Sequence, residues 1–482
     1  MNAITYRGYH IVIGIEIHVQ LSTQSKMFSH SPHAFGQTPN TQACEIDCAL
    51  PGTLPKPNLE AFRKAIKLGL MVGSNVNKTT QFDRKNYYYP DLPKGYQITQ
   101  DKSPIIVGGS VEIETAHGKK TIGIHHAHLE EDAGKSNHMQ HQCGIDLNRA
   151  GAPLLEIVSQ PDMRSIEETI AYLKAVHALV RYLDISNANM QQGQFRADVN
   201  VSIRRSDDSP FGTRAELKNI NSFKFIEKAL VFEINRQIDL IESGGSVVQE
   251  TRLYHEASNT TRSMRSKEDA HDYRYFPDPD LCTFVISDEF IESIRQQCPQ
   301  HPKMIMQELI STHGLQEPDA RLLAYDRTFY QWFQSALDNG IDAKSVTNWI
   351  TGPLSALINK HSTDSSNLPI TKEDFVQLLT RIQDKTISGH IGKSVIEDMW
   401  LTAASPDQII SDKGLKQITD TSALIALIND ILQNHPEQVA QYRSGKEKLI
   451  GFFVGQAMKA SKGQAKPDLL KELIEQQLRT QQ

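Results

Sequence analysis

Histidine and acidic side chains are concentrated in one short stretch, residues 124–136, which reads IHHAHLEEDAGKS. Carboxylate oxygens are the ligands that Mg²⁺ prefers, with substrate phosphates and water completing its coordination, and histidine is a common additional ligand. The stretch therefore predicts a site for a hard divalent cation. A charged strand that is simply solvated is the alternative interpretation, because short acidic runs are usually surface features.

Other segments have the alternating pattern of β-strands and carry polar groups of the same kind. In residues 11–21, IVIGIEIHVQL, every odd position is aliphatic, so Glu16 and His18 are expected to share the opposite face of a sheet. The run LLEIV places Glu156 in an apolar strand, where an unpaired carboxylate is costly. Residues 195–203 and 213–218 alternate similarly, although solvation alone can also produce a polar sheet face. The outward side chains of these two segments, which we predict to bind a nucleotide cofactor, are Arg196, Asp198, Asn200, Arg214, Glu216 and Lys218.

Length and composition limit the class of protein. A chain of 482 residues exceeds a single hydrophobic core, so two or three domains are expected. The net charge of −6 means that any contact with nucleic acid must come from a local basic patch. Because no apolar run is long enough to cross a membrane and the N-terminus lacks the apolar core of a signal peptide, we expect a soluble, cytoplasmic protein.

The five cysteines are scattered, which is typical of a reducing compartment. Cys44 and Cys48 could form half of a zinc site, but no second pair of cysteines or histidines with suitable spacing follows nearby, so we do not expect this protein to bind zinc. The sequence also lacks a Walker A loop, a GxGxxG turn and a GxSxG elbow. A nucleotide would therefore bind on a sheet face through metal, and the chain has no hydrolytic nucleophile of its own.

The pattern changes along the chain from strands to helices. Residues 162–183 and 223–243 have the apolar periodicity of helices. Beyond about residue 290, strand patterns give way to helical ones, which indicates a domain boundary. Near the C-terminus, Lys459, Lys462 and Lys466 are predicted to contact a phosphate backbone, although a solvated helical face has the same composition.

Eight motifs occur in an order that matches a known family. They read GIEIHVQL, LPGTLP, FDRKNYYYPDLPKGYQITQ, HLEEDAGKS, DLNRAGAPLLEIVSQPD, RADVNVSI, GTRAELKNINSF and HDYRYFPDPDL. Over essentially its whole length, the chain resembles the B subunits of aspartyl/glutamyl-tRNA amidotransferases. The resemblance implies an α+β fold, with an antiparallel-sheet cradle domain resembling the glutamine synthetase sheet (1–292), an all-α middle domain (293–407) and an all-α, tRNA-binding tail domain (408–482).

The resemblance also implies a reaction and its components. The protein would use ATP and Mg²⁺ to phosphorylate the side-chain carboxyl of Glu-tRNA(Gln) or Asp-tRNA(Asn), and ammonia would then give Gln-tRNA(Gln) or Asn-tRNA(Asn). The A subunit of the family, an amidase, would release the ammonia from glutamine, and the small C subunit would complete a heterotrimer. Lys85 falls where the family gates the ammonia channel. Some members carry a CxxC zinc element, from which Cys44-x-x-x-Cys48 departs.

The resemblance further implies, by motif, that five residues are metal ligands. We predict that His18, Glu131 and Glu156 hold one Mg²⁺, with Glu16 and Glu130 at a neighbouring position. Successive strand residues face opposite sides of a sheet, so Glu130 and Glu131 can reach one site only if their strand ends or bulges nearby.

Two other functions fit parts of the pattern. A free-standing ATP-dependent ligase that amidates a small carboxylic acid with ammonia would use the same sheet, but it has no use for a basic helical tail. A non-catalytic tRNA-binding scaffold would leave the polar sheet face without a role. The several histidine and carboxylate positions on that face argue against a scaffold.

Overall fold

The computed structural model describes residues 5–206, 209–218, 220–266, 273–365, 367–415, 421–461, 465 and 467–480. The chain divides into two compact units, Met1–Pro299 and Gln300–Gln482. The first combines a large sheet with helices and the second is helical, so the predicted mixture of helices and strands is confirmed. Among the described residues, no helix has both the length and the apolar composition needed to cross a membrane.

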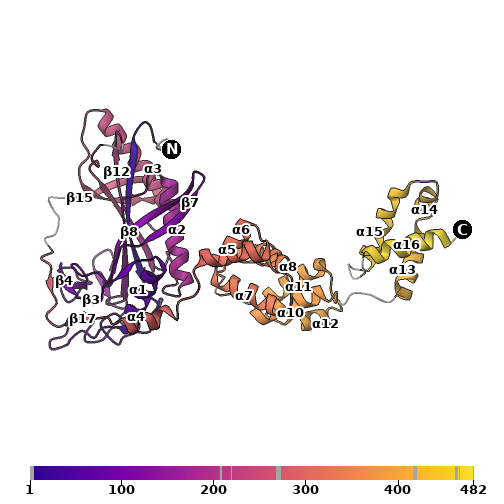
Figure 1. The fold of residues 1–482 in the computed structure, drawn as a ribbon, viewed down its shortest axis with the longest axis horizontal. Helices are drawn as coiled ribbons and strands as arrows, with labels where there is room; N and C mark the ends of the chain where they lie inside the picture. Colours follow the sequence, from indigo (N-terminus) through magenta and orange to yellow (C-terminus); the bar gives the residue numbers. More distant parts are fainter. Residues whose placement is uncertain are drawn as a thin grey trace. The chain divides into compact units, whose positions relative to one another are not determined.

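The large sheet of the first unit has 13 strands, with the main order β15-β14-β13-β12-β1-β11-β8-β5-β4-β16 (Figure 1). In the same sheet, β6 and β7 pair with β8, and β2 pairs with β6. Its pairs are antiparallel apart from the parallel pair β13–β14. The strands are β1 His10–Gln20, β2 Asn75–Val76, β4 Asp83–Asn86, β5 Tyr96–Thr99, β6 Ile106–Val107, β7 Ser110–Thr115, β8 Gly118–Glu131, β11 Pro153–Ser159, β12 Phe195–Arg204, β13 Ala215–Lys218, β14 Glu250–His255, β15 Thr260–Ser266 and β16 Phe276–Pro277.

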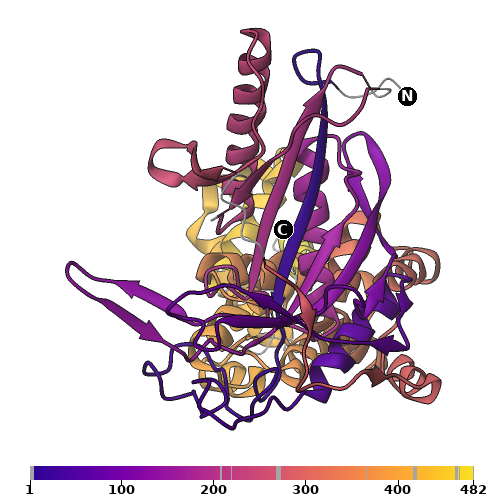
Figure 2. The ribbon, with the colours of Figure 1, turned by 90° about the vertical axis from the view of Figure 1, so that its left-hand side faces the viewer.

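Two further strand pairs lie outside the large sheet. One is a hairpin of β9 and β10 that projects from the unit (Figure 2), and the other pairs β3 with β17. Between β6 and β7, Gly108 and Gly109 adopt positive φ angles, so these two strands of the large sheet are separate elements. The bounds are β3 Thr79–Thr80, β9 Lys135–His138, β10 Cys143–Asp146 and β17 Phe284–Val285.

Strand β1 lies in the middle of the sheet and carries the core on one face. Its odd-numbered residues from Ile11 to Val19 are at most 3% exposed, as the alternation predicts. Burying one such side chain contributes about 1.5–3 kcal/mol, so this row ties the sheet firmly to the core. Helix α2 packs on β7, α3 packs on β12 and α2 packs on α3. The helices of this unit are α1 Leu59–Met71, α2 Ile166–Tyr182, α3 Phe223–Glu242, the 3₁₀ turn Glu256–Ser258 and α4 Asp288–Arg295.

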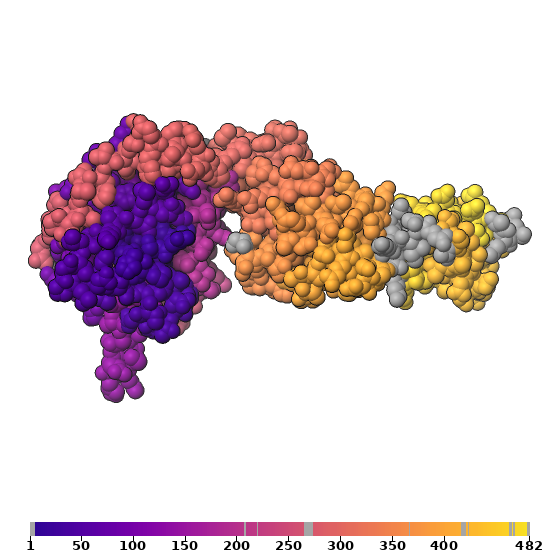
Figure 3. Space-filling model, turned by 90° about the horizontal axis from the view of Figure 1, so that it is seen from below, coloured from indigo at the N-terminus to yellow at the C-terminus, as the bar shows by residue number. Residues whose placement is uncertain are grey.

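The second unit consists of two groups of helices, which Figure 3 shows in space-filling form along with the first unit. Helices α13–α16 enclose a hydrophobic core that includes Leu424, Phe453 and Leu470. In the other group, α12 packs on α10 and α11, so the predicted boundary at 407/408 falls inside a helix. The helices are α5 Pro302–His313, α6 Glu317–Tyr325, α7 Arg327–Asp338, α8 Ala343–Trp349, a π turn Ile350–Leu354, α9 Ser355–His361, α10 Lys372–Gln383, α11 Gly389–Thr402, α12 Pro406–Asp412, α13 Thr421–Asn434, α14 Pro436–Arg443, the 3₁₀ turn Glu447–Leu449, α15 Ile450–Ala460 and α16 Pro467–Thr480.

A buried carboxylate joins α3 to the β14–β15 end of the sheet. Glu233 is fully buried, and its oxygens lie 2.6 Å from Arg236 Nη2 and 3.2 Å from Arg252 Nε. The hydroxyl of Thr261 on β15 donates a hydrogen bond to Glu233 Oε2 at 3.0 Å. Removing one partner of a buried ion pair is costly because the other charge stays desolvated.

We expect Glu233→Gln to lower the free energy of unfolding of the first unit by about 3 kcal/mol. Glu292→Gln is the control, because its exposed ion pair contributes less than about 1 kcal/mol. Amide hydrogen exchange of α3 during urea unfolding measures the change. Tryptophan fluorescence should be unaffected, since Trp332, Trp349 and Trp400 all lie in the second unit. Equal stabilities of the two variants would contradict the prediction.

Candidate functional site

Four adjacent strands, in the order β12-β1-β11-β8, carry most of the predicted site residues. The register places His18 of β1 opposite Glu156 of β11 and opposite Arg196 of β12. Glu156 in turn lies opposite His128 of β8. Residues directly opposite each other on neighbouring strands point to the same face. The polar groups of all four strands therefore gather on the face away from the aliphatic row.

His18, Glu130 and Glu156 form the first group on this face, which we call the histidine cluster. One ligand atom of each lies within 4.8 Å of the other two. The Nε2 atom of His18 is 3.2 Å from Glu156 Oε2 and 3.7 Å from Glu130 Oε1. The Nε2 atom of His128 approaches the same carboxylates at 3.5 and 3.7 Å. His128 belongs to the histidine-rich stretch of the sequence, but it was not among the predicted ligands.

The charges of the histidine cluster depend on one another. Burial disfavours a protonated His18, but the hydrogen bond to Glu156 and the charges of Glu156 and Glu130 raise the pKa of His18 to about 9. Burial also disfavours an ionised Glu156, yet the hydrogen bond and charge of His18 hold the pKa of Glu156 well below its ordinary value. A proton on His18 thus supplies the positive charge that a bound cation would supply instead.

Glu16, Asp198 and Glu216 form a second group, the acidic cluster, whose ligand atoms also lie within 4.8 Å of one another. Lys218 Nζ lies 2.8 Å from Asp198 Oδ2 and 2.9 Å from Glu216 Oε1. Asn200 Nδ2 donates to Glu16 Oε1 at 3.1 Å. Burial and the neighbouring carboxylates raise the pKa of Glu16 above its ordinary value. The group therefore has an excess of negative charge that a cation would relieve.

Glu131 lies on the opposite face of β8 and belongs to neither cluster. From His126 to Glu131, the residues of β8 pair regularly with β11, so their side chains alternate between the two faces of the sheet. The irregularity in this pairing, a bulge at His125, lies earlier in the strand. The Glu131 carboxylate accepts a hydrogen bond from the Ile98 N–H at 3.0 Å and pairs with the Lys94 ammonium. The histidine cluster thus contains Glu130 in the place that we predicted for Glu131. Glu130 and Glu131 could share one site only if β8 bulged beside them, and the strand pairs regularly there.

Two cations border the histidine cluster. Arg196 Nη2 donates to Asp132 Oδ2 at 2.8 Å, and the charge of Asp132 raises the pKa of Arg196. The Lys85 ammonium lies 4.8 Å from the ring centre of Tyr273. Burial disfavours charge on Lys85, but the Glu130 carboxylate raises its pKa above the ordinary value. Both side chains therefore present positive charge to the carboxylates of the cluster.

A pocket of about 500 Å³ opens beside the acidic cluster, and we call it the Gly14 pocket. Glycine is required at position 212 on its wall, since a Cβ there would lie 2.1 Å from the Ile203 carbonyl oxygen. Its size is that of a small-molecule site, and its wall offers a cation, hydroxyls and an aromatic ring. Among the residues that line it are Gly14, Glu16, Asn200, Phe211, Gly212 and Arg214.

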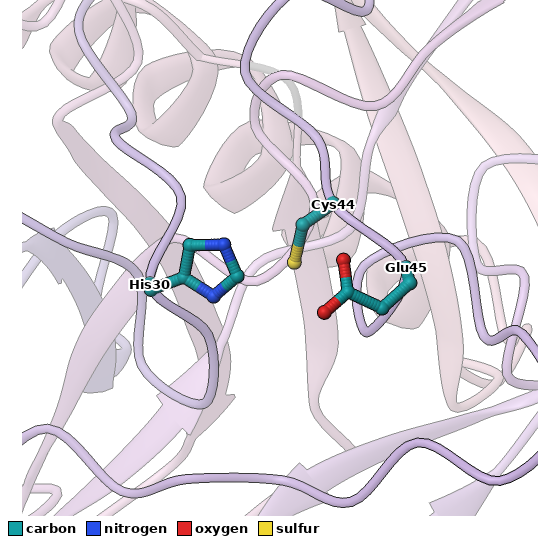
Figure 4. A group of neighbouring side chains, drawn as sticks. All are labelled: His30, Cys44 and Glu45. Atoms are coloured by element: carbon teal, nitrogen blue, oxygen red, sulfur yellow. The ribbon is translucent and has the colours of Figure 1, made fainter.

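A third group of possible ligands, His30, Cys44 and Glu45, lies in the segment between β1 and α1 (Figure 4). The Lys26–Asp47 ion pair, at 3.1 Å, is buried next to it, and Asp47 also accepts a hydrogen bond from the Cys44 N–H. The sequence pattern did not predict His30 as a ligand, because His30 lies well before the two cysteines in the chain. The expectation that zinc is not bound stays a prediction.

The predicted tRNA-contacting lysines are described only in part. Lys459 is exposed near the end of α15. Lys462 and Lys466 lie outside the described residues.

The donor atoms on the sheet face fit a hard divalent cation. The histidine cluster offers carboxylate oxygens and one imidazole nitrogen, and the acidic cluster offers carboxylate oxygens alone. Glu16 and His18 are alternate residues of β1, so their backbones are roughly 7 Å apart. The two clusters therefore suit two neighbouring ions, the arrangement that stabilises a phosphoryl group in transfer.

Comparison with known proteins identifies the class. The domain family described as the GatB/GatE catalytic domain matches residues 11–292, and the GatB domain matches residues 331–478. Three proteins named as the B subunit of aspartyl/glutamyl-tRNA(Asn/Gln) amidotransferase are similar throughout. That of Coxiella burnetii (strain CbuG_Q212) is 53% identical, over 97% of this chain and 99% of that protein. Those of Thioalkalivibrio sulfidiphilus and Hydrogenovibrio crunogenus are each 52% identical, over 98% of this chain and 99% and 100% of those proteins.

The first unit is thus a catalytic domain of the GatB/GatE class. With such identity over nearly the whole chain, the protein belongs to the family of aspartyl/glutamyl-tRNA(Asn/Gln) amidotransferase B subunits. The predicted function, as one component of a tRNA-dependent and glutamine-dependent ligase that acts in a complex, is confirmed. The comparisons support neither the free-standing ligase nor the scaffold.

Metal binding tests the composition of the histidine cluster. We expect Glu130→Gln and Glu156→Gln to weaken Mn²⁺ binding by more than tenfold, because losing even an outer-shell partner of a metal site costs about that much. Electron paramagnetic resonance of Mn²⁺ with the purified chain measures it. Glu131→Gln makes the same chemical change on the opposite face of β8, so this variant should bind Mn²⁺ as tightly as the wild type. A loss in Glu131→Gln alone would restore the assignment made from the sequence.

Proposed function

We propose that this chain performs the ATP-dependent step of tRNA-dependent amidation. In that step the side-chain carboxyl of Glu-tRNA(Gln) or Asp-tRNA(Asn) is phosphorylated and then attacked by ammonia. The observation that carries the proposal is the pair of clusters on one sheet face beside a pocket of nucleotide size. Phosphoryl transfer is catalysed mainly by positioning and by neutralising charge, and this face supports both.

The residues of the two clusters have distinct roles in this proposal. The histidine cluster would hold one Mg²⁺ and the acidic cluster a second, with ATP in the Gly14 pocket. The bound ions would neutralise the charge that develops on the transferred phosphoryl group. Lys218 fixes the carboxylates of Asp198 and Glu216 by direct contacts, so the acidic cluster keeps its shape before ligands arrive. Arg196 and Lys85 add positive charge beside the histidine cluster, where the acyl phosphate would form.

The ammonia would come from a partner. The amidase, or A subunit, would release it from glutamine, and the small C subunit would complete a heterotrimer. Two observations support this: the sequence lacks a motif for a hydrolytic nucleophile, and the relatives are named as subunits. The amidase would contact the cradle (1–292), a sheet resembling that of glutamine synthetase, with Lys85 at the entrance for ammonia. The two groups of helices in the second unit would contact the tRNA. The reaction would take place in the cytoplasm, where aminoacyl-tRNAs are used.

Isosteric replacement of the cluster carboxylates tests the phosphorylation step. In the assembled complex, Glu130→Gln and Glu156→Gln should lower tRNA-dependent ADP formation at least about a hundredfold, the scale on which loss of an electrostatic catalytic group is felt. Glutamine hydrolysis by the partner and tRNA binding should persist, because these substitutions keep the shape of the site. Near-normal amidation by both variants at saturating Mg²⁺ would place the reaction elsewhere.

Removal of the C-terminal helices tests tRNA binding. Deleting residues 416–482 leaves α12 intact and removes the predicted basic patch. We expect weaker binding of Glu-tRNA(Gln) and a flatter salt dependence, since each lost phosphate contact lowers the log-log slope by about 0.9. The KM for ATP should not change. Filter binding between low and physiological salt measures both quantities, and an unchanged slope would exclude a role for the patch.

A further inference from the structure

A second polar pocket lies on the same sheet, at the end of β1 opposite to Gly14. It encloses about 500 Å³, and we call it the Gln20 pocket. Gln20 and Gln194 are neighbours across β1 and β12, joined by a backbone hydrogen bond of 2.9 Å. Both side chains continue the even-numbered rows that carry His18 and Arg196. The residues that line the pocket include Gln20, Thr23, His33, Phe35, Gln192 and Gln194.

The wall of the Gln20 pocket is neutral and held by its own hydrogen bonds. The Thr23 hydroxyl donates to the Ser25 carbonyl at 2.6 Å, so it accepts from Nε2 of His33 at 3.0 Å. His33 Nδ1 is then the acceptor for the Gln20 amide at 3.1 Å. Burial lowers the pKa of His33, which keeps this ring uncharged at neutral pH. The pocket thus presents amides, hydroxyls and an imidazole in fixed positions.

The Gln20 pocket lacks the features that favour a triphosphate. Among the described residues that line it there is no lysine, arginine or carboxylate, whereas the Gly14 pocket contains Arg214 and Glu16. It does contain Phe35, whose side chain is 62% exposed. An exposed ring beside amide donors and acceptors suits a nucleobase, which stacks on aromatic rings and hydrogen-bonds through its edges.

The order of groups along β1 places the two pockets on either side of the clusters. Gly14 and Glu16 both line the Gly14 pocket, and Glu16 is also a member of the acidic cluster. His18 belongs to the histidine cluster, and Gln20 lines the Gln20 pocket. Alternate strand residues are roughly 7 Å apart, so this row spans about 20 Å. A nucleotide at one end and a second ligand at the other would both reach the histidine cluster.

We propose that the Gln20 pocket binds the terminal adenosine of the aminoacylated tRNA, and that it thereby places the esterified amino acid at the histidine cluster. The inference rests on the proposed function and adds a subsite for its acceptor substrate. The base stacks on Phe35 and bonds to the amides of Gln20 and Gln194. The side-chain carboxyl then lies between the two clusters, facing the phosphoryl group that it accepts.

Kinetics of the assembled complex test the assignment. Phe35→Ala and Gln194→Ala should each raise the KM for Glu-tRNA(Gln) about tenfold or more, the scale of one lost base-stacking contact, and leave the KM for ATP within twofold. Arg214→Ala, the matched change in the Gly14 pocket, should raise the KM for ATP instead. Because Phe35 and Arg214 are both exposed, neither substitution removes a core contact.

Binding to a truncated tRNA isolates the terminal base. The wild-type complex should bind full-length tRNA more tightly than tRNA without its terminal adenosine, and Phe35→Ala should abolish this difference. The assignment would be overturned if Phe35→Ala weakened the binding of both tRNAs equally, or if it raised the KM for ATP. It would also be overturned if all the values stayed unchanged. Failure of the wild-type complex to amidate Glu-tRNA(Gln) would instead refute the proposed function, so the two failures are distinct.

Discussion

The register between β1 and its two neighbours is the constraint on which the site depends. His18 lies opposite Glu156 and Arg196, and Glu16 lies opposite Asp198, because the three strands pair at these positions. A slip of one residue would turn β1 over, exposing its aliphatic row and burying Glu16 and His18 in the core. The hydrophobic effect that holds β1 in the sheet therefore also assembles both clusters.

The same register brings carboxylates together against their mutual repulsion. Glu156 is balanced by His18 and His128, and the acidic cluster by Lys218. Such groups do not stabilise the fold by themselves, because desolvating charges costs more than the contacts return. They persist because the strands that carry them are fixed by the core on the other face. A site built on strands in this way is preorganised, since its polar groups lose little freedom when a ligand binds.

The local patterns of apolar residues predicted individual strands and helices correctly, because these depend mainly on neighbouring residues in the sequence. The alternation of residues 11–21 and the lone carboxylate in LLEIV predicted β1 and β11, and the helix expected over 223–243 is α3, Phe223–Glu242. Contacts between distant strands could not be predicted in this way. Alternation alone could not tell whether Glu130 or Glu131 faces β1, since that depends on the pairing of β8 with β11. For the same reason, the parallel pair β13–β14 was missed.

The geometry of the sheet also separates the directions from which three substrates would arrive. The Gly14 and Gln20 pockets lie along β1, so ATP and the acceptor end would approach the histidine cluster from its two sides along the strand. Lys85 belongs to β4, which is reached across β11, β8 and β5, so ammonia entering there would travel across the strands. An acyl phosphate is consumed by water unless ammonia reaches it first, and a separate entrance lets ammonia arrive while both other ligands are in place. The half-buried Lys85 suits that entrance, because the charge of Glu130 raises its pKa and it keeps positive charge near the point where the acyl phosphate would form.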